Sequence, residues 1–170
     1  MRHSTLEQIE SIDVEACLDE LADALAPLVQ TDPQPVMVGI RSGGAWLAER
    51  LHRRLGLSTP LGTLNITFYR DDFSRIGLHP RVEPSDIPVS LEDRSVLLVD
   101  DVLHTGRTVR AAMNELFDYG RPAAIRLIVL VDRGERELPV AADHLAVSVA
   151  MPRGGQIKLA GPDPLRLERK

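Results

Sequence analysis

The sequence has one cysteine and few aromatic residues, which make up 4% of its 170 positions. The single thiol, Cys17, cannot form a disulfide within the chain, and its place in an apolar helical pattern favours a small core residue over a nucleophile. We therefore expect a reducing compartment, the cytoplasm. The longest apolar runs, near residues 123–131, are much shorter than the roughly 20 residues that a membrane helix needs, and no secretory signal is visible. No contact with a membrane is expected.

Lysine is also scarce, because eighteen of the 20 basic residues are arginine. Residues 5–40 contain eight acidic residues and no lysine or arginine, whereas residues 41–136 contain fourteen arginines against thirteen acids. The net charge of -5 argues weakly against a general nucleic-acid binder. The arginines suit bidentate contacts with phosphate, and a compositional bias of the source explains them equally well.

Periodic patterns along the chain predict one α/β domain over residues 1–170, with a mostly parallel twisted sheet and helices on its faces. Apolar spacing predicts helices and short apolar runs predict strands, while prolines and glycines mark the connections. The expected helices are 13–29, 45–55 and 107–119, and the expected strands are 36–40, 61–69, 96–99, 123–131, 144–150 and 156–160. Pro162 and Pro164 indicate a loose tail.

The most informative stretch is VLLVDDVLHTGRT, from Val96 to Thr108. Its apolar start predicts a buried parallel strand with Asp100 and Asp101 at the carboxyl end, where open α/β sheets bind their ligands. The turn from Thr105 to Thr108 leads into a helix whose first N–H groups can bind phosphate, while the carboxylates can accept hydrogen bonds from ribose hydroxyls. The stretch therefore predicts a sugar-phosphate site.

An acidic receiver pocket is the alternative for a strand that ends in two aspartates. In a receiver domain the pair ends the first strand, whereas here about a hundred residues precede it and Thr105-Gly106-Arg107-Thr108 follows. Acidic groups alone do not need that turn. The ribose-phosphate interpretation is preferred for this reason.

The same stretch closely resembles the phosphoribosyl diphosphate (PRPP) signature of type I phosphoribosyltransferases. The resemblance covers roughly residues 12–160 and extends to four further pieces in the same order, which are similar to the members that regulate pyrimidine operons. It implies a type I phosphoribosyltransferase fold with a lid loop over about residues 70–95 and hood-like elements from the termini. The four pieces are GIRSGGAWLAERL (39–51), GTLNITFYRDD (62–72), RTVRAAM (107–113) and VLVDRGERELP (129–139).

The resemblance also implies the site residues. Asp100 and Asp101 hold the ribose, and fixed negative charge there stabilises the oxocarbenium-like sugar that forms as pyrophosphate leaves. Arg41 joins them as a catalytic residue and, with Ser42, binds the pyrophosphate. Many relatives read Thr-Arg-Gly where this chain reads Ser42-Gly43-Gly44, so one expected cation is missing. The complete set expected at PRPP or the nucleotide is Arg41, Ser42, Val99, Asp100, Asp101, Val102, Leu103, His104, Thr105, Gly106, Arg107 and Thr108.

Three more regions complete the expected site. Arg70 and Arg81 lie in the lid loop and either reach a phosphate on closure or remain solvated. Arg133 and Ile157 are expected on the base-binding side. Relatives often have tyrosine where this chain has His104, so we interpret His104 as a loop residue and not as an acid or base catalyst.

The resemblance implies a uracil phosphoribosyltransferase, which converts uracil and PRPP into UMP and diphosphate. Mg²⁺ is expected through pyrophosphate and ribose oxygens with water, and not in an all-protein site. The alternatives are a phosphoribosyltransferase for another base and a nucleotide sensor with little catalysis or RNA binding.

The resemblance further implies a regulator that responds to UMP or UTP, binds the leader of pyrimidine-operon mRNA and causes transcription attenuation. Relatives commonly have Asp-Arg-Gly-His-Arg where this chain has Glu135 in the fourth place, and their first helix is more basic. Fewer cations reduce the counterion release that supplies much of RNA affinity. A homo-oligomer, dimeric or higher, is expected.

Overall fold

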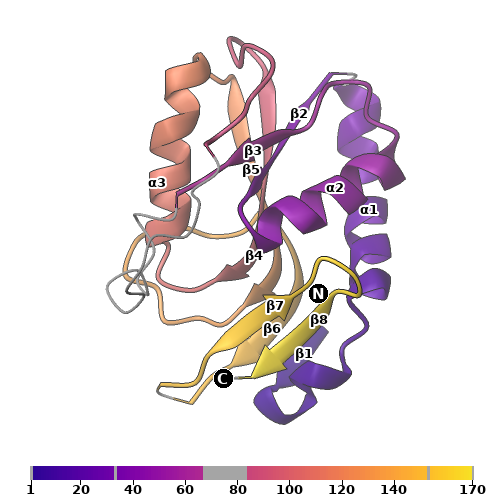
Figure 1. Ribbon diagram of the computed structural model, residues 1–170, viewed down its shortest axis with the longest axis vertical. Helices are drawn as coiled ribbons and strands as arrows, with labels where there is room; N and C mark the ends of the chain where they lie inside the picture. The colour runs from indigo at the N-terminus through magenta and orange to yellow at the C-terminus, as the bar shows by residue number, and fades with distance from the viewer. Residues whose placement is uncertain (1, 33, 67–83, 153, 170) are drawn as a thin grey trace.

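The computed structural model describes residues 2–32, 34–66, 84–152 and 154–169. Six parallel strands form one sheet in the order β1-β6-β5-β4-β2-β3, so that β4 lies in the middle (Figure 1). This arrangement confirms the α/β class and the mostly parallel sheet. The strands are β1 (Arg2–Thr5), β2 (Val36–Ile40), β3 (Gly62–Leu64), β4 (Ser95–Leu103), β5 (Ala124–Asp132) and β6 (His144–Ala150).

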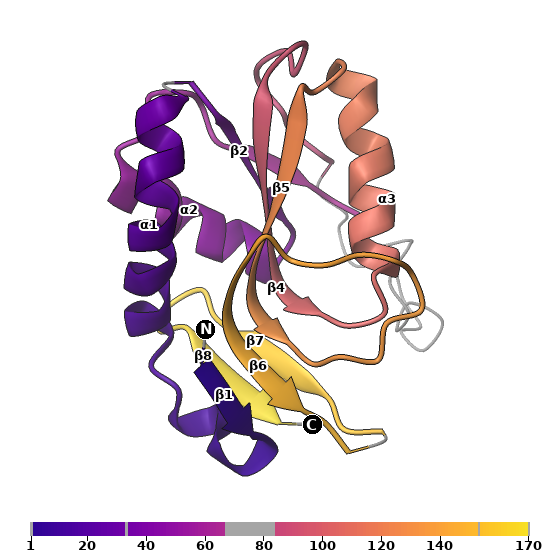
Figure 2. The same ribbon diagram turned by 180° about the vertical axis from the view of Figure 1, so that it is seen from behind.

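Helices cover both faces of the sheet (Figure 2). On one face α1 (Val14–Thr31) and α2 (Gly43–Leu55) bury an apolar cluster that includes Leu97 and Val99 of β4. On the other face α3 (Arg107–Leu116) packs over Val96 and Leu98 of the same strand. Successive side chains of β4 thus serve opposite layers, as the period of a strand requires. Two short 3-10 helices, η1 (Leu6–Ser11) and η4 (Phe117–Tyr119), complete the helical set of the described residues.

Two strands near the termini were not predicted. The polar segment of β1 pairs in parallel with Val147–Ala150 of β6 at the edge of the sheet, where backbone hydrogen bonds suffice without an apolar alternation. The expected loose tail contains β8 (Arg166–Arg169), which pairs antiparallel with β7 (Ile157–Ala160) in a separate hairpin. Pro162 and Pro164 lie in the turn between the two strands.

Three predicted boundaries are also corrected. β4 continues to Leu103, beyond the expected end at Val99. β3 spans only Gly62–Leu64, and the rest of the expected strand from residue 67 lies outside the described residues. The third helix ends at Leu116, because the chain tightens into η4 before Gly120.

Residues 67–83 lie outside the described residues, and with them the two expected lid residues, Arg70 and Arg81. The last part of the segment expected as a lid is packed. Ile87 and Leu91 are buried, and Thr63 of β3 exchanges backbone hydrogen bonds with Asp86 at 2.7 and 2.8 Å. Only the earlier part of the segment therefore remains a candidate lid.

The terminal elements meet at one end of the molecule (Figures 1 and 2). Glu10 of η1 accepts hydrogen bonds from the backbone N–H and the guanidinium of Arg169 in β8, at 3.3 and 3.4 Å.

No helix among the described residues is long and apolar enough to cross a membrane.

Candidate active site

The two aspartates lie inside the carboxyl-terminal part of β4, the central strand, and not in an exposed loop beyond it. The exposed fraction is 2% for Asp100 and 9% for Asp101. β2 pairs with this strand up to Val99, and β5 pairs with it up to Leu103, so both aspartates continue a strand in the middle of the sheet. Burial makes the negative charges stronger in their effect on a bound cationic sugar than they would be in water.

The two carboxylates serve opposite sides of the strand. The carboxylate of Asp101 lies against Gly43, so closely that a Cβ at position 43 would overlap it. Asp100 lines a small hollow with residues 102–106 and the start of α3, and its Oδ1 accepts a hydrogen bond from the N–H of Asp101 at 3.0 Å. The end of β4 thus connects the loop before α2 with the loop before α3.

The loop between β2 and α2 brings Arg41 and Ser42 to the same edge of the sheet. The N–H of Arg41 donates to the carbonyl of Leu64 at 2.8 Å, and its guanidinium donates to Oγ1 of Thr63 at 3.2 Å. The Arg41–Ser42 peptide bond is cis, and α2 starts at once with Gly43, two residues before the predicted start. The positive end of this helix dipole therefore faces Asp101, in a position suited to bind an anion as well.

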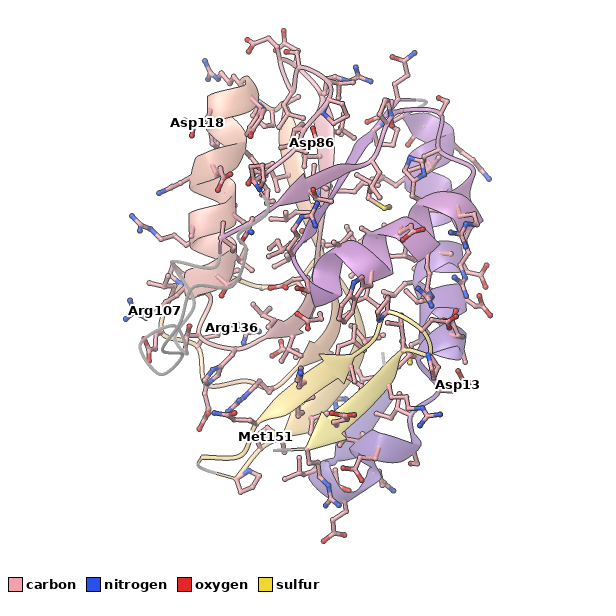
Figure 3. The ribbon with its side chains drawn as sticks, in the orientation of Figure 1. Asp13, Asp86, Arg107, Asp118, Arg136 and Met151 are labelled. Carbon is pink, nitrogen blue, oxygen red and sulfur yellow. The ribbon has the colours of Figure 1, made fainter. Side chains whose placement is uncertain are left out.

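The nucleotide loop from His104 to Thr108 leads directly into α3, as predicted. Thr105 is buried, and its Oγ1 accepts a hydrogen bond from the N–H of Arg107 at 3.2 Å. Gly106 caps the helix with φ +92°, a backbone conformation that glycine adopts readily. The amides that open α3 are therefore held at the edge where a phosphate is expected. Arg107, which Figure 3 labels, is half exposed. It forms a 2.7 Å ion pair with Glu137.

The loop after β5, residues 133–140, is fastened to this nucleotide loop. The N–H of Arg133 donates to the carbonyl of Leu103 at 3.1 Å, and the carbonyl of Thr105 accepts from Glu137 and Leu138 at 3.0 and 3.1 Å. Arg136 adds hydrogen bonds to the carbonyls of His104 and Val140 and an ion pair with Asp132. The predicted base side and the nucleotide loop therefore form one continuous structure.

Glu135 occupies a position that the sequence did not reveal as part of the site. It has φ +57°, and its Oε2 accepts from Nε2 of His104 and from the guanidinium of Arg133, both at 3.2 Å. Arg133 is only 8% exposed, so its charge depends on this partner. Thirty-one positions separate His104 from Glu135, and no local pattern predicts their contact.

Ile157, the other residue expected near the base, begins β7, which contacts β4. It is 8% exposed and belongs to the apolar cluster on the α1 and α2 face, together with Val131 of β5. The hairpin thus places an apolar side chain near the carboxyl edge of the sheet. Its contact with a base remains a prediction.

A match to a family and two relatives identify the chain. Residues 8–150 match the family described as "Phosphoribosyl transferase domain". A protein of Nitrosococcus oceani is 52% identical over 160 residues, which cover 92% of this chain and 90% of the relative, and one of Pseudomonas aeruginosa PAO1 is 53% identical with 81% of each chain covered. Both relatives carry the name "Bifunctional protein PyrR". The chain belongs to the PyrR phosphoribosyltransferases.

Solved structures give the PyrR chain the type I phosphoribosyltransferase fold. A hypoxanthine phosphoribosyltransferase of Staphylococcus aureus has a TM-score of 0.63 at 21% identity, covering 82% of this chain and 74% of that one. A purine phosphoribosyltransferase of Pyrococcus horikoshii has a TM-score of 0.58 at 23% identity, covering 89% and 93%. At these identities the likeness shows the fold and carries no information on the base.

Proposed function

We propose that this PyrR phosphoribosyltransferase transfers the ribosyl phosphate of PRPP to uracil, giving UMP and diphosphate, and that it regulates pyrimidine genes in the cytoplasm. One observation carries the enzymatic part. Buried Asp101 at the end of β4 lies against Gly43 of the proposed pyrophosphate loop, while adjacent Asp100 faces the proposed 5′-phosphate loop. A PRPP molecule has its two anionic groups on either side of the ribose, and this arrangement matches that order.

In the proposed reaction the ring nitrogen of uracil forms a bond to C1′ as the bond between C1′ and the pyrophosphate oxygen breaks. The amides that open α3 hold the 5′-phosphate, and Arg41 with the first amides of α2 holds the pyrophosphate. Asp100 and Asp101 accept hydrogen bonds from the ribose hydroxyls and stabilise the positive charge that develops on the sugar.

Mg²⁺ fits this arrangement as a companion of the substrate. Among the described residues there is no group of three or more His, Cys, Asp or Glu side chains that could hold a metal ion. The carboxylate oxygens of Asp100 and Asp101 are the donor type that Mg²⁺ prefers, and pyrophosphate, ribose and water would supply the other ligands. When bound, the ion would neutralise the leaving pyrophosphate.

A turnover assay with PRPP and Mg²⁺ tests the enzyme across uracil, hypoxanthine, xanthine and orotate. We expect UMP and diphosphate from uracil and at most trace product from the other bases. The PyrR relatives do not favour another base as the substrate. Production of a purine nucleotide in preference to UMP would contradict the proposal, and equilibrium binding of PRPP shows whether an inactive preparation still has its site.

The regulatory part of the proposal is that UMP or UTP binding changes the affinity for the leader of pyrimidine-operon mRNA and thereby attenuates transcription. The name of the relatives, bifunctional, supports a second activity beside catalysis. We also propose a homo-oligomer, which sedimentation would measure. A gel-shift titration of the leader RNA with and without UMP tests RNA binding; no complex at modest salt rejects direct attenuation.

A further inference from the structure

His104 and Glu135 form a histidine–carboxylate pair between the nucleotide loop and the loop after β5. The Nε2–Oε2 distance is 3.2 Å, and both side chains are partly exposed, at 35% and 43%. His104 lies four residues after Asp100 and lines the same hollow at the start of α3. The pair therefore lies at the predicted junction of ribose and base.

The hydrogen bond decides which nitrogen of the imidazole can act as a base. An ionised carboxylate can only accept hydrogen bonds, so Nε2 of a neutral His104 carries the hydrogen. Nδ1 then keeps its lone pair and is the acceptor. Glu135 is held in place because its carboxylate also accepts a hydrogen bond from the guanidinium of Arg133. Its two neighbours are held as well, since Gly134 donates to Asp132 and Arg136 donates to the carbonyl of His104.

The pair is not needed to hold the two loops together. Backbone hydrogen bonds from Glu137 and Leu138 already join the loop after β5 to the nucleotide loop, and the N–H of Arg133 joins it to the end of β4. Arg136 adds a bond to the carbonyl of His104. These four bonds do not involve the imidazole. The contact between His104 and Glu135 is thus an additional feature of the site, and it fixes which ring nitrogen of His104 can accept a proton.

The sequence favoured a loop role for His104, but its contact with Glu135 changes that interpretation. We propose that His104 accepts the proton that uracil loses in the reaction and that Glu135 is the residue that positions it. This inference rests on the proposed uracil phosphoribosyltransferase activity. The proton passes from N1 of uracil to Nδ1 of His104, and the electron pair of that N–H bond forms the bond from N1 to C1′. The bond from C1′ to pyrophosphate breaks, and its electron pair leaves with the pyrophosphate. Glu135 stabilises the imidazolium that results.

The charged groups around His104 set the conditions of this transfer. Glu135 binds the ring, Arg133 shares that carboxylate, and Arg136 binds the carbonyl of His104. Asp100 lines the same hollow, and Asp101 lies next to it in β4. Only a neutral imidazole can accept a proton, so kcat/KM for uracil should be low in acid and rise with pH.

The first measurement compares pH profiles of the wild-type protein, His104→Gln, Glu135→Gln and the control Glu49→Gln. Gln at position 104 can still donate to Glu135 but cannot accept a proton. We expect His104→Gln to lower kcat by about 100-fold or more and to lose the rising limb. Glu135→Gln should lower kcat less and keep a limb. Glu49, in an exposed ion pair with Arg53, lies outside the site, and its variant should retain the wild-type profile.

The second measurement replaces uracil by 5-fluorouracil, whose ring N–H is more acidic and needs less help to lose its proton. The His104→Gln variant should lose a smaller factor in kcat with 5-fluorouracil than with uracil, a difference that a purely structural role of His104 would not produce. Equal losses with both bases, or an unchanged pH limb in an active variant, would overturn the assignment of His104. A wild-type protein that binds PRPP but turns over neither pyrimidine would overturn the proposed activity and this inference together.

Discussion

At the scale of the residue, Gly43 controls how the pyrophosphate loop meets the end of β4. Its missing side chain leaves the space in which the carboxylate of Asp101 lies. The family resemblance predicts an arginine at this place in the motif, so the sequence indicates that one cation is missing. In the structure, a side chain at position 43 would occupy the space in which the carboxylate of Asp101 lies.

A Gly43→Ala substitution tests this exclusion. The new Cβ would collide with the carboxylate of Asp101, so we expect a loss of about 1–3 kcal/mol in the free energy of unfolding and a raised KM for PRPP. Urea denaturation and steady-state kinetics measure the two effects. The control is Gly56→Ala at the end of α2, where a Cβ meets nothing within 4 Å and only the φ of +60° is unfavourable. It should lower stability by about 1 kcal/mol and leave KM unchanged.

Replacement of Asp100 or Asp101 by asparagine tests the proposed role of their negative charges. Each variant should lower kcat by about 10²–10³-fold, because an amide cannot stabilise the developing positive charge on the sugar. The carboxylates are buried, so the unfolding free energy must be measured beside the rate. An active, stable Asp101→Asn variant would contradict the role assigned to that residue.

At the scale of the element, α1 and α2 are joined by ion pairs across 35 or more positions of sequence. Glu15 of α1 binds both Arg50 and Arg54 of α2, at 2.8 and 2.6 Å, and Asp19 binds Arg54 at 2.7 Å. Arg50 also donates to the carbonyl of Pro162 at 3.0 Å, in the turn of the β7–β8 hairpin. The acidic first helix, which carries no basic residue, thus finds its counter-ions within the molecule.

A Glu15→Gln substitution should make stability depend less on pH. Partial burial acts to raise the pKa of Glu15, but hydrogen bonds from Arg54 and Arg50 outweigh it, and the pKa lies below the ordinary value of 4.5. A lowered pKa in the folded state means that the stabilisation is present above pH 4.5 and is lost as the pH falls further through the folded value. Because the side chain is half exposed, we expect a loss of only about 0.5–1 kcal/mol at pH 7, vanishing in acid.

Thermal or urea unfolding of both proteins at pH 7 and pH 3 measures this difference. Glu49→Gln is the matched control, since the Glu49–Arg53 pair lies within α2 and is 60% and 73% exposed. A Glu15→Gln penalty that stayed the same at pH 3 would show that packing, and not charge, is responsible.

The predictable elements are those with an apolar period. The apolar spacing of α1 and the apolar runs of β4 and β5 are local patterns that predict which side chains are buried. The structure contains all three elements. The sequence did not predict β1 and β8, because these strands are stabilised by partners elsewhere in the chain. The partner is Val147–Ala150 for β1 and β7 for β8. The sequence also did not predict the burial of Asp100 or the contact between His104 and Glu135. Both features depend on loops that only the complete fold brings together.

At the scale of the whole molecule, the internal pairing of arginines limits the positive surface available to an RNA. Arg107, Arg133 and Arg136 face Glu137, Glu135 and Asp132 respectively. Figure 3 shows Arg107 and Arg136 at the same end of α3. Cations that already have carboxylate partners release fewer counterions on binding a phosphate backbone, so RNA affinity should be modest and its salt dependence shallow.

Glu135→Gln should therefore strengthen binding of the leader RNA while it weakens uracil turnover. The substitution removes a negative charge beside Arg133 and His104, and a several-fold gain in affinity at about 150 mM salt is expected from reduced repulsion. Filter binding or gel shift across a salt series measures it, with Glu49→Gln as the control. An unchanged affinity would show that RNA does not approach this loop.

The pairing of β1 with β6 has a consequence for the order in which the chain folds. Arg2 and Thr5 have Val147 and Ala150 as partners, so β1 has no strand to pair with until residues 147–150 have been synthesised. A domain generally folds as a unit, so its sheet is completed only when all of its strands are present. Residues 2–5 therefore join the sheet only after β6 has been synthesised, and a nascent chain halted before β6 would leave them unpaired and exposed to proteases.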